Sequence, residues 1–162
     1  MILTDYFYYN DKTSIIEQLE QLKCEWRAIP YLLLLLKEET FHKHLGNGKL
    51  ILLLDDKNLS DEKPTLVSFA SFCDRDEIDV PLCPWIGFVF TAPSYRGNHF
   101  MGQIINYCME LAFSDYPESE YVYVSTDETG LYEKYGFTFF QKMQTVLNED
   151  TNVYRRKIKN LK

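Results

Sequence analysis

The sequence is short of basic residues, and this shortage bounds the partners that the protein can bind. Lys and Arg together number 17 against 24 Asp and Glu, which gives a formal net charge of −7. A basic surface supplies most of the affinity for nucleic acid, so the composition argues against general nucleic-acid binding. An acidic protein suits a cationic partner such as an amine, but the same acidity can serve only to keep the protein in solution.

Cysteine and histidine are also scarce. The four cysteines do not form the C-x-x-C spacing of zinc and thiol–disulfide sites. Their mostly apolar neighbours predict buried free thiols in a reducing compartment. Of the three histidines, His42 and His44 lie two positions apart on a predicted helix and do not share one face. We therefore expect no metal site, and the sequence gives no support for covalent catalysis by a Ser-His-Asp or Cys-His arrangement. The cysteines are Cys24, Cys73, Cys83 and Cys108.

Long apolar runs are missing as well. The longest strongly apolar stretch, Ile29–Leu36, falls far short of the ~20 residues that a membrane-spanning helix needs. The N-terminus carries Asp5 early and has no basic segment before an apolar run, so no secretory signal is predicted. We therefore expect a soluble, cytoplasmic protein without a membrane or nucleic-acid partner, and we leave homodimerisation open.

Apolar and aromatic side chains, in contrast, are plentiful, at 46% and 15% of the 162 residues. This composition predicts a folded core, and the length fits one domain over residues 1–162. Hydrophobic periodicity predicts the element order β-α-α-β-β-β-α-β-α-β-β, a mixed α+β fold with an antiparallel meander in the middle. The predicted strands are 3–9, 50–54, 65–73, 85–91, 121–124, 137–140 and 152–158; the predicted helices are 11–22, 30–45, one from 100 onward and 129–135; a polar loop is predicted at 57–64.

Two local details of this prediction concern single residues. Thr13 or Ser14 is expected to cap the first helix, because a hydroxyl there can accept a backbone hydrogen bond. Strict alternation along 65–73 places Leu66 on the same face of its strand as Ala70.

The transition from strand to helix near residue 97 is the strongest local signal for a ligand. A helix N-terminus presents free backbone N–H groups and about half a positive charge, and together these bind phosphates. Arg96, Gly97 and Asn98 stand where the loop becomes the helix. Gly97 permits the close approach of a phosphate, and Arg96 can add charge-assisted hydrogen bonds. The alternative is an ordinary turn with an exposed arginine.

The segment Val89–Asn98 resembles the strand and pyrophosphate loop of the GNAT acetyltransferase family. The family pattern is an arginine or glutamine, two residues, a glycine, one residue, and then glycine or alanine. Arg96-Gly97 matches its opening, whereas His99 and Met101 stand where the family has glycines, and Gly102 is one position late. Both side chains must then point away from a bound ligand, which helical φ values at the two positions would allow.

A second segment, Ser125–Phe137, is similar to the GNAT segment that follows the fifth strand. Its Leu-Tyr-Glu-Lys-Tyr-Gly-Phe run puts Tyr132 where the family has a tyrosine near the coenzyme sulfur. The resemblance therefore implies that Tyr132 is the general acid that protonates the departing thiolate. Ser125 takes the approximate place of a family asparagine. The alternative for Tyr132 is an aromatic ring that only packs on a short helix, which Gly136 can end in a left-handed conformation.

Together the two segments imply a GNAT-type fold, with a mixed, mostly antiparallel central sheet that is flanked by helices and splayed between the fourth and fifth strands. The implied function is transfer of an acetyl group from acetyl-CoA, by direct attack, to a primary amine of an unidentified small molecule, peptide or protein. The alternative is a non-catalytic sensor or interaction module that binds CoA or acyl-CoA. The cofactor-binding residues that the resemblance implies are Val89, Phe90, Thr91, Arg96, Gly97, Asn98, His99, Phe100, Met101, Gly102, Gln103 and Ser125.

The general base has no family counterpart at the fourth strand, since residues 82–86 contain no acid. The preceding connection is rich in carboxylates, and among them Glu77 is our choice. The alternative is a solvated turn whose charges only attract a cationic amine. The candidate bases are Asp74, Asp76, Glu77 and Asp79. The candidates to line the acceptor pocket, with core packing as their alternative role, are Trp26, Tyr31 and Phe41.

Overall fold

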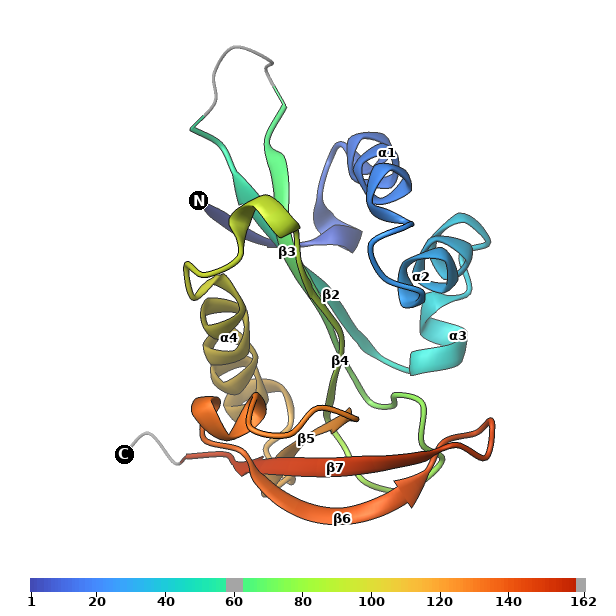
Figure 1. The fold of residues 1–162 in the computed structure, drawn as a ribbon, viewed down its shortest axis with the longest axis vertical. Coiled ribbons are helices and arrows are strands. Elements are labelled where there is room, and N and C mark those ends of the chain that lie inside the picture. Colours follow the sequence, from blue (N-terminus) through green and yellow to red (C-terminus); the bar gives the residue numbers. More distant parts are fainter. Residues whose placement is uncertain (58–62, 160–162) are drawn as a thin grey trace.

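A computed structural model describes residues 1–57 and 63–159 and shows a seven-stranded sheet of order β1-β2-β3-β4-β5-β7-β6 (Figure 1). Neighbouring strands are antiparallel, apart from the parallel pair β4 and β5. The predicted α+β architecture is confirmed. The strands are β1 (Ile2–Asp5), β2 (Gly48–Asp55), β3 (Thr65–Cys73), β4 (Trp85–Thr91), β5 (Tyr121–Thr126), β6 (Thr138–Gln144) and β7 (Asp150–Lys157). The helices are α1 (Lys12–Leu22), α2 (Ala28–Lys37), α3 (Phe41–Leu45) and α4 (Phe100–Asp115), and the 3-10 helices are η1 (Tyr6–Tyr8), η2 (Pro93–Tyr95) and η3 (Tyr132–Tyr135).

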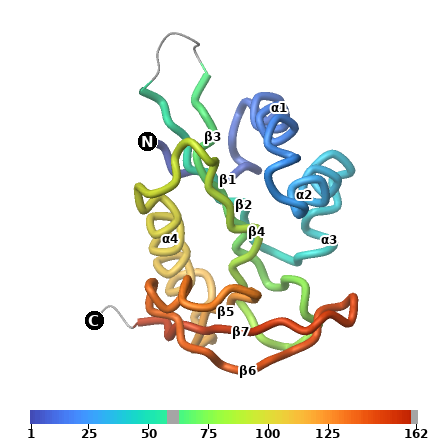
Figure 2. The backbone as a smooth tube through the Cα atoms, in the orientation of Figure 1, coloured from blue at the N-terminus to red at the C-terminus, as the bar shows by residue number. Residues whose placement is uncertain are grey.

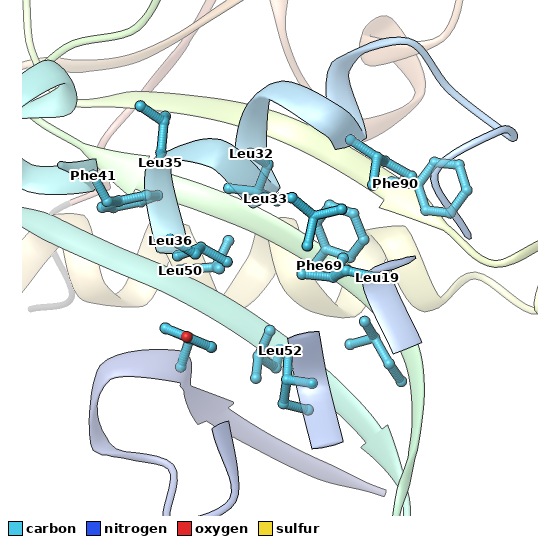
Figure 3. Close-up of a cluster of buried hydrophobic side chains, with 14 of the residues drawn as sticks. Leu19, Leu32, Leu33, Leu35, Leu36, Phe41, Leu50, Leu52, Phe69 and Phe90 are labelled. Carbon is cyan, nitrogen blue, oxygen red and sulfur yellow. The ribbon is translucent and has the colours of Figure 1, made fainter. Parts of the chain in front are cut away.

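Helices cover both faces of the sheet around β2, β3 and β4. α1, α2 and α3 lie on one face and α4 lies on the other (Figure 1, Figure 2). In the first layer, leucines of α2 face Phe69 of β3 and Phe90 of β4 (Figure 3). In the second layer, Ile104 and Cys108 of α4 are fully buried against the sheet. Each buried side chain of this kind contributes about 1.5–3 kcal/mol, so the two clusters hold both helical layers against the sheet.

The helix that the sequence predicts at 30–45 is two helices in the structure. α2 ends at Lys37, Glu39 takes a left-handed φ of 58°, and α3 begins at Phe41. The reason is the core: Leu36 and Phe41 are both buried, yet an unbroken helix would rotate them about 140° apart. The break lets both side chains enter the same cluster.

Three other expectations are corrected by local hydrogen bonds and register. Asp11 caps α1, since its Oδ1 accepts a bond of 3.1 Å from the Ser14 N–H, so neither Thr13 nor Ser14 is the cap. The first strand ends at Asp5, whose carboxylate accepts a bond of 3.2 Å from the Phe7 N–H at the turn into η1. A bulge between β2 and β3 reverses the alternation, so Leu66 joins the α1–α3 layer, while Ala70 faces α4.

The remaining differences concern the ends of elements and the exposure of the cysteines. The helix predicted at 129–135 is reduced to η3, and most of the loop predicted at 57–64 lies outside the described residues. Cys73 and Cys108 are buried as expected, Cys83 is partly buried, and Cys24 is exposed. Over residues 1–57 and 63–159, no helix has both the length and the apolar character that crossing a membrane requires.

Candidate active site at the divergence of β4 and β5

The two parallel strands at the centre of the sheet separate soon after they meet. β4 and β5 pair only at Trp85–Tyr123 and Ile86–Val124. The rest of β4 keeps its bonds to β3, but on the edge that faces β5 it has no strand partner within residues 1–57 and 63–159. Such an edge offers backbone N–H and C=O groups to an extended ligand, which can add to it like another strand. The splay predicted between the fourth and fifth strands is confirmed.

A bulge deforms β4 at the point where the strands part. Phe88 and Val89 together lie opposite one residue of β3, between the register pairs Ser71–Gly87 and Phe69–Phe90. Phe88 has a φ of 49°, in the left-handed region that a bulky side chain seldom adopts. The Phe90 ring lies in the core, so only its backbone can reach a ligand at the divergence of β4 and β5. Strain of this kind concentrates at functional sites, because it re-aims backbone groups.

The N-terminus of α4 lies at the end of the loop that leaves β4, and no side chain of the described residues caps it. α4 has 16 residues, so its first N–H groups carry the positive end of a full helix dipole. Gly97, with a φ of 84°, has nothing within 4 Å of the place where a Cβ would stand. The loop therefore leaves room for an anion directly at these N–H groups.

The two residues that replace family glycines behave differently from each other. Met101 lies in the first turn of α4, and its partly buried side chain packs against the cluster between α4 and the sheet. This fits the expectation for Met101. His99 does not fit it: its φ is 61° and its ψ is 23°, a left-handed conformation in place of the expected helical one. The loop thus keeps a backbone shape that favours glycine, and an exposed histidine adopts it.

Substituting His99 with glycine is expected to stabilise the protein. A left-handed conformation costs an L-residue roughly 1–2 kcal/mol, and glycine removes most of that cost. We expect the free energy of unfolding, measured by urea denaturation, to rise by about 1 kcal/mol. Asn98→Gly is the control, because Asn98 donates side-chain bonds of 3.1 and 3.3 Å to the carbonyls of Tyr95 and Arg96, and its loss should lower stability. A less stable His99→Gly protein would contradict the assigned strain.

Arg96 is held at the end of β4 and keeps most of its donors free. Its Nε donates a bond of 3.0 Å to the Thr91 carbonyl, and its guanidinium carbon lies 5.4 Å from the centre of the Phe90 ring. Phe90 also stacks with Trp26: the two ring centres lie 5.9 Å apart and the ring planes are at an angle of 4°. No carboxylate of the described residues pairs with Arg96. Its terminal N–H groups can therefore bind phosphate.

Tyr132 lies on η3, which follows β5 in the chain and contacts the first turn of α4 through Tyr135. In a 3-10 helix residues i and i+3 share one face, so Tyr132 and Tyr135 point the same way. Tyr135 lies against Gly102 in the first turn of α4, where a Cβ would be 3.0 Å from its ring. Tyr132 is 6% exposed and packs edge-on against Phe137. Burial raises the pKa of Tyr132, and the negative charges of Glu128 and Asp76 raise it further.

Gly136 ends η3 as expected, with a left-handed φ of 84° and its N–H bonded to the Glu133 carbonyl at 3.1 Å. This turn sends the chain back into β6 and lets Phe137, which is 1% exposed, enter the core beside Tyr132.

Asp76 lies directly against β4, next to the point where β4 and β5 part. A Cβ added to Gly87 would overlap Asp76 Oδ1, and it would lie 2.9 Å from Ser71 Oγ. The missing side chain of Gly87 therefore makes the space that the carboxylate fills, one residue before the bulge. Burial raises the pKa of Asp76 to about 7, and the neighbouring charge of Glu77 contributes to the rise. The carboxyl is thus poised to exchange a proton near neutral pH.

The other acids of the β3–β4 connection have different surroundings. Glu77 accepts a bond of 2.8 Å from Ser125 Oγ, which lies 2.8 Å from Thr151 Oγ1. The Ser125 hydroxyl is therefore engaged with the side chains of Glu77 and Thr151. Asp74 accepts a bond of 2.9 Å from the Tyr116 hydroxyl at the C-terminus of α4, and another of 3.0 Å from the Asn47 N–H. Asp74 serves structure, whereas Asp76 and Glu77 lie together beside the cleft.

The acetyltransferase (GNAT) family model matches residues 15–137 of the sequence, which include the cleft, the α4 N-terminus, Tyr132 and Asp76. The chain belongs to this family. The resemblance of the two segments is thereby confirmed. No curated protein matches the sequence.

Solved structures of GNAT proteins share the fold over nearly the whole chain. An aminoglycoside 6'-N-acetyltransferase complexed with coenzyme A has a TM-score of 0.69 at 14% identity, with 100% of this chain and 99% of that chain covered. An acyl-CoA N-acyltransferase from Pseudomonas aeruginosa has a TM-score of 0.61 at 14% identity, over 96% and 97% of the two chains. A GNAT acetyltransferase from Staphylococcus aureus Mu50 has a TM-score of 0.61 at 12% identity, over 98% and 99%. At these identities the likeness establishes the fold.

Sequence reasoning missed the pairing of Gly87 with Asp76. A signal for it exists, because an isolated glycine inside a strand pattern indicates a bulge or a close approach to the backbone. The sequence does not show which of four nearby acids makes that approach. Of the residues expected at the acceptor pocket, Phe41 is 1% exposed and belongs to the core, whereas Tyr31 is 48% exposed and Trp26 is partly buried.

Proposed function

We propose that the protein transfers the acetyl group of acetyl-CoA to a primary amine by direct attack, with Asp76 as the general base. The observation that carries this proposal is the carboxylate of Asp76 over Gly87, at the point where β4 bulges and leaves β5. The uncapped N-terminus of α4 lies at the far end of the same strand edge. One edge thus connects a site for phosphate with a site for proton transfer.

The residues present fit an acyl-CoA cosubstrate, which would supply the thioester-bound acetyl group. The backbone of Val89 and Thr91 on the free edge of β4 would hold an extended pantetheine chain by strand-like hydrogen bonds. The N–H groups at the start of α4 and the terminal N–H groups of Arg96 would bind the pyrophosphate. The Met101 side chain would leave room for this ligand, since it packs against the cluster between α4 and the sheet.

Asp76 would remove the proton from the attacking amine. In the balanced reaction the amine nitrogen bonds to the acyl carbon, the carbon–sulfur bond breaks, one proton leaves the nitrogen, and one proton is gained by the sulfur. Asp76 suits the first proton because its raised pKa of about 7 makes its carboxylate a stronger base than an ordinary aspartate. The geometry favours Asp76 over Glu77, since Glu77 is already bonded to Ser125. Glu77 would then tune Asp76 through its charge.

Tyr132 would assist the departing sulfur. Its pKa is raised by burial, so the phenol is protonated throughout the neutral range and can donate a hydrogen bond. An ordinary thiol has a pKa near 8.5, below that of the phenol, so Tyr132 would donate a hydrogen bond to the thiolate, which would then take its proton from water. A backbone N–H at the β4 bulge would polarise the thioester carbonyl.

The test of the cofactor seat is isothermal titration calorimetry with acetyl-CoA and with CoA. We expect micromolar binding that weakens at least tenfold in Arg96→Glu, because a repulsive charge replaces a phosphate donor. Lys142→Glu on β6 is the matched control for the change of charge, and it should bind as the wild type does. Absence of binding at millimolar ligand would remove the enzyme proposal.

His99 gives specific support to the alternative of a non-catalytic CoA-binding module, since a strained histidine stands at a family glycine position. Binding of acetyl-CoA without transfer to any amine in a broad screen would favour that alternative. Formation of an acetylated amine, detected by mass spectrometry, would exclude it.

A further inference from the structure

Aromatic side chains lie beside the proposed base, on the face of the sheet that α1–α3 cover. The ring of Tyr31 on α2 lies 6.0 Å from the ring of Phe88, at an angle of 40°. Tyr31 is 48% exposed, and Leu34, one turn later on α2, is 49% exposed. Phe88 is partly buried. These side chains form an apolar surface that the chain itself leaves open.

The carboxylate and this surface adjoin consecutive residues of β4. Asp76 lies over Gly87, and Phe88 is the next residue along β4. Consecutive Cα atoms are about 3.8 Å apart, so the Phe88 side chain leaves the backbone one residue from the position that Asp76 covers. Glu77 adds a second negative charge next to the first, which attracts a protonated amine to the same place.

The tip of the β6–β7 hairpin adds further apolar side chains to this region. The Val146 N–H donates a bond of 2.8 Å to the Glu77 carbonyl, which fixes the tip beside the acids. Val146 and Leu147 are 64% and 75% exposed. The hairpin turn and α2 lie on the same side of the molecule in Figure 1. The approach to Asp76 thus offers two carboxylates for a cation and mainly apolar atoms for the rest of an acceptor.

We infer that the acceptor is a small arylalkylamine, a primary amine joined to an aromatic ring by a two- or three-carbon chain. This inference rests on the proposed function. The amine meets Asp76, and the ring meets Tyr31 and Phe88, where aromatic pairs add to the burial of apolar area. Acceptors with many hydroxyl or amino groups, such as polyamines and aminosugars, leave those groups against apolar side chains, which costs free energy.

The experiment has a binding arm and a turnover arm. Calorimetry of 2-phenylethylamine with the CoA-saturated protein measures binding without chemistry. Release of the thiol from acetyl-CoA measures turnover for 2-phenylethylamine, butylamine, spermidine, an aminoglycoside and a short peptide with an apolar N-terminal residue. We expect 2-phenylethylamine to have the highest kcat/KM of the panel, at least tenfold above butylamine.

Variants identify the contact. Tyr31→Ala should raise the KM for 2-phenylethylamine about tenfold and leave that for butylamine unchanged, and Tyr31→Phe should restore the wild-type value. Tyr8→Ala is the control, because Tyr8 is an 85% exposed aromatic residue on η1, outside this surface. A preference for spermidine, the aminoglycoside or the peptide would overturn the inference, as would a silent Tyr31→Ala or a dimer that buries Tyr31. In each of these cases CoA would still bind and the proposed function would be unaffected, whereas a protein that does not bind CoA would contradict the proposed function itself.

Discussion

Replacing Asp76 with asparagine is expected to lower kcat by about 10²- to 10⁴-fold and leave the Kd for CoA unchanged. The amide keeps the size of the side chain and still fits the space over Gly87. It cannot accept a proton from the amine. The proposed CoA site lies at the β4 edge and the α4 N-terminus, which the substitution does not touch. Turnover by thiol release and binding by calorimetry measure the two quantities separately.

The pH dependence of the same pair of proteins gives a second readout. Asp76 acts as a base only when it is deprotonated, so kcat/KM of the wild type should fall as the pH drops below about 7, the raised pKa of Asp76. The asparagine variant should lose this limb of the profile. Glu77→Gln should move the limb to lower pH, because the Glu77 charge helps to raise the pKa of Asp76. Asp79→Asn, an exposed acid in the same connection, is the control and should leave the profile unchanged.

Stability should change in the opposite sense to activity. The pKa of Asp76 is raised from 3.8 to about 7 in the folded protein, so the folded state binds more protons than the unfolded state between these values. Stability therefore falls as the pH rises through this window. The asparagine variant escapes the loss, and its Tm should exceed that of the wild type at pH 8, with the difference shrinking toward pH 4.

If Glu77→Gln abolishes turnover while Asp76→Asn retains it, the base is Glu77.

Replacing Tyr132 with phenylalanine is expected to lower kcat by roughly ten- to a thousandfold. The substitution removes only the hydroxyl, so the packing against Phe137 remains and the fold is preserved. KM for the acceptor should stay near its wild-type value, because the hydroxyl serves the departing sulfur. Single-turnover kinetics with acetyl-CoA separate this chemical step from product release.

Tyr135→Phe is the matched control for Tyr132. Tyr135 shares the same face of η3 and lies against Gly102, but the sequence resemblance assigns it no part in the chemistry. Its hydroxyl should be dispensable for turnover. An unchanged rate in Tyr132→Phe would show that Tyr132 only packs beside the cleft. With an acyl donor whose leaving thiol has a lower pKa, the difference in kcat between the wild type and Tyr132→Phe should be smaller, because that thiolate needs less assistance.

The elements that the sequence predicts best are those in which one local pattern dominates. β3 at Thr65–Cys73 and β4 at Trp85–Thr91 match their predicted bounds, because β-branched and aromatic residues fill both runs between clear turn residues. The break between α2 and α3 is different. It arises because Leu36 and Phe41 both pack into the cluster between the helices and the sheet, and one unbroken helix could not turn both side chains toward that cluster.

The residues of the candidate site also differ in whether a local sequence pattern predicts them. Arg96-Gly97 and Tyr132 are recognisable in the sequence because each belongs to a contiguous segment of its family. The position of Asp76 depends on its contact with Gly87, 11 positions later in the chain. No local sequence pattern specifies such a contact between a loop and a strand. The left-handed φ of His99 also follows from the path of the loop, since nothing in a histidine favours that conformation over a helical one.

The bond between Tyr116 and Asp74 has a mechanical consequence for the site. α4 carries the proposed phosphate-binding N–H groups at one end, and at its other end the Tyr116 hydroxyl donates a hydrogen bond to Asp74, two residues before Asp76. The helix of 16 residues is a strut roughly 24 Å long, and helices of this length resist compression and bending. The proposed phosphate site and the proposed base are thus connected to opposite ends of one helix. A shift of α4 along its axis would carry both together, and the spacing between them would be preserved as the surrounding layers move.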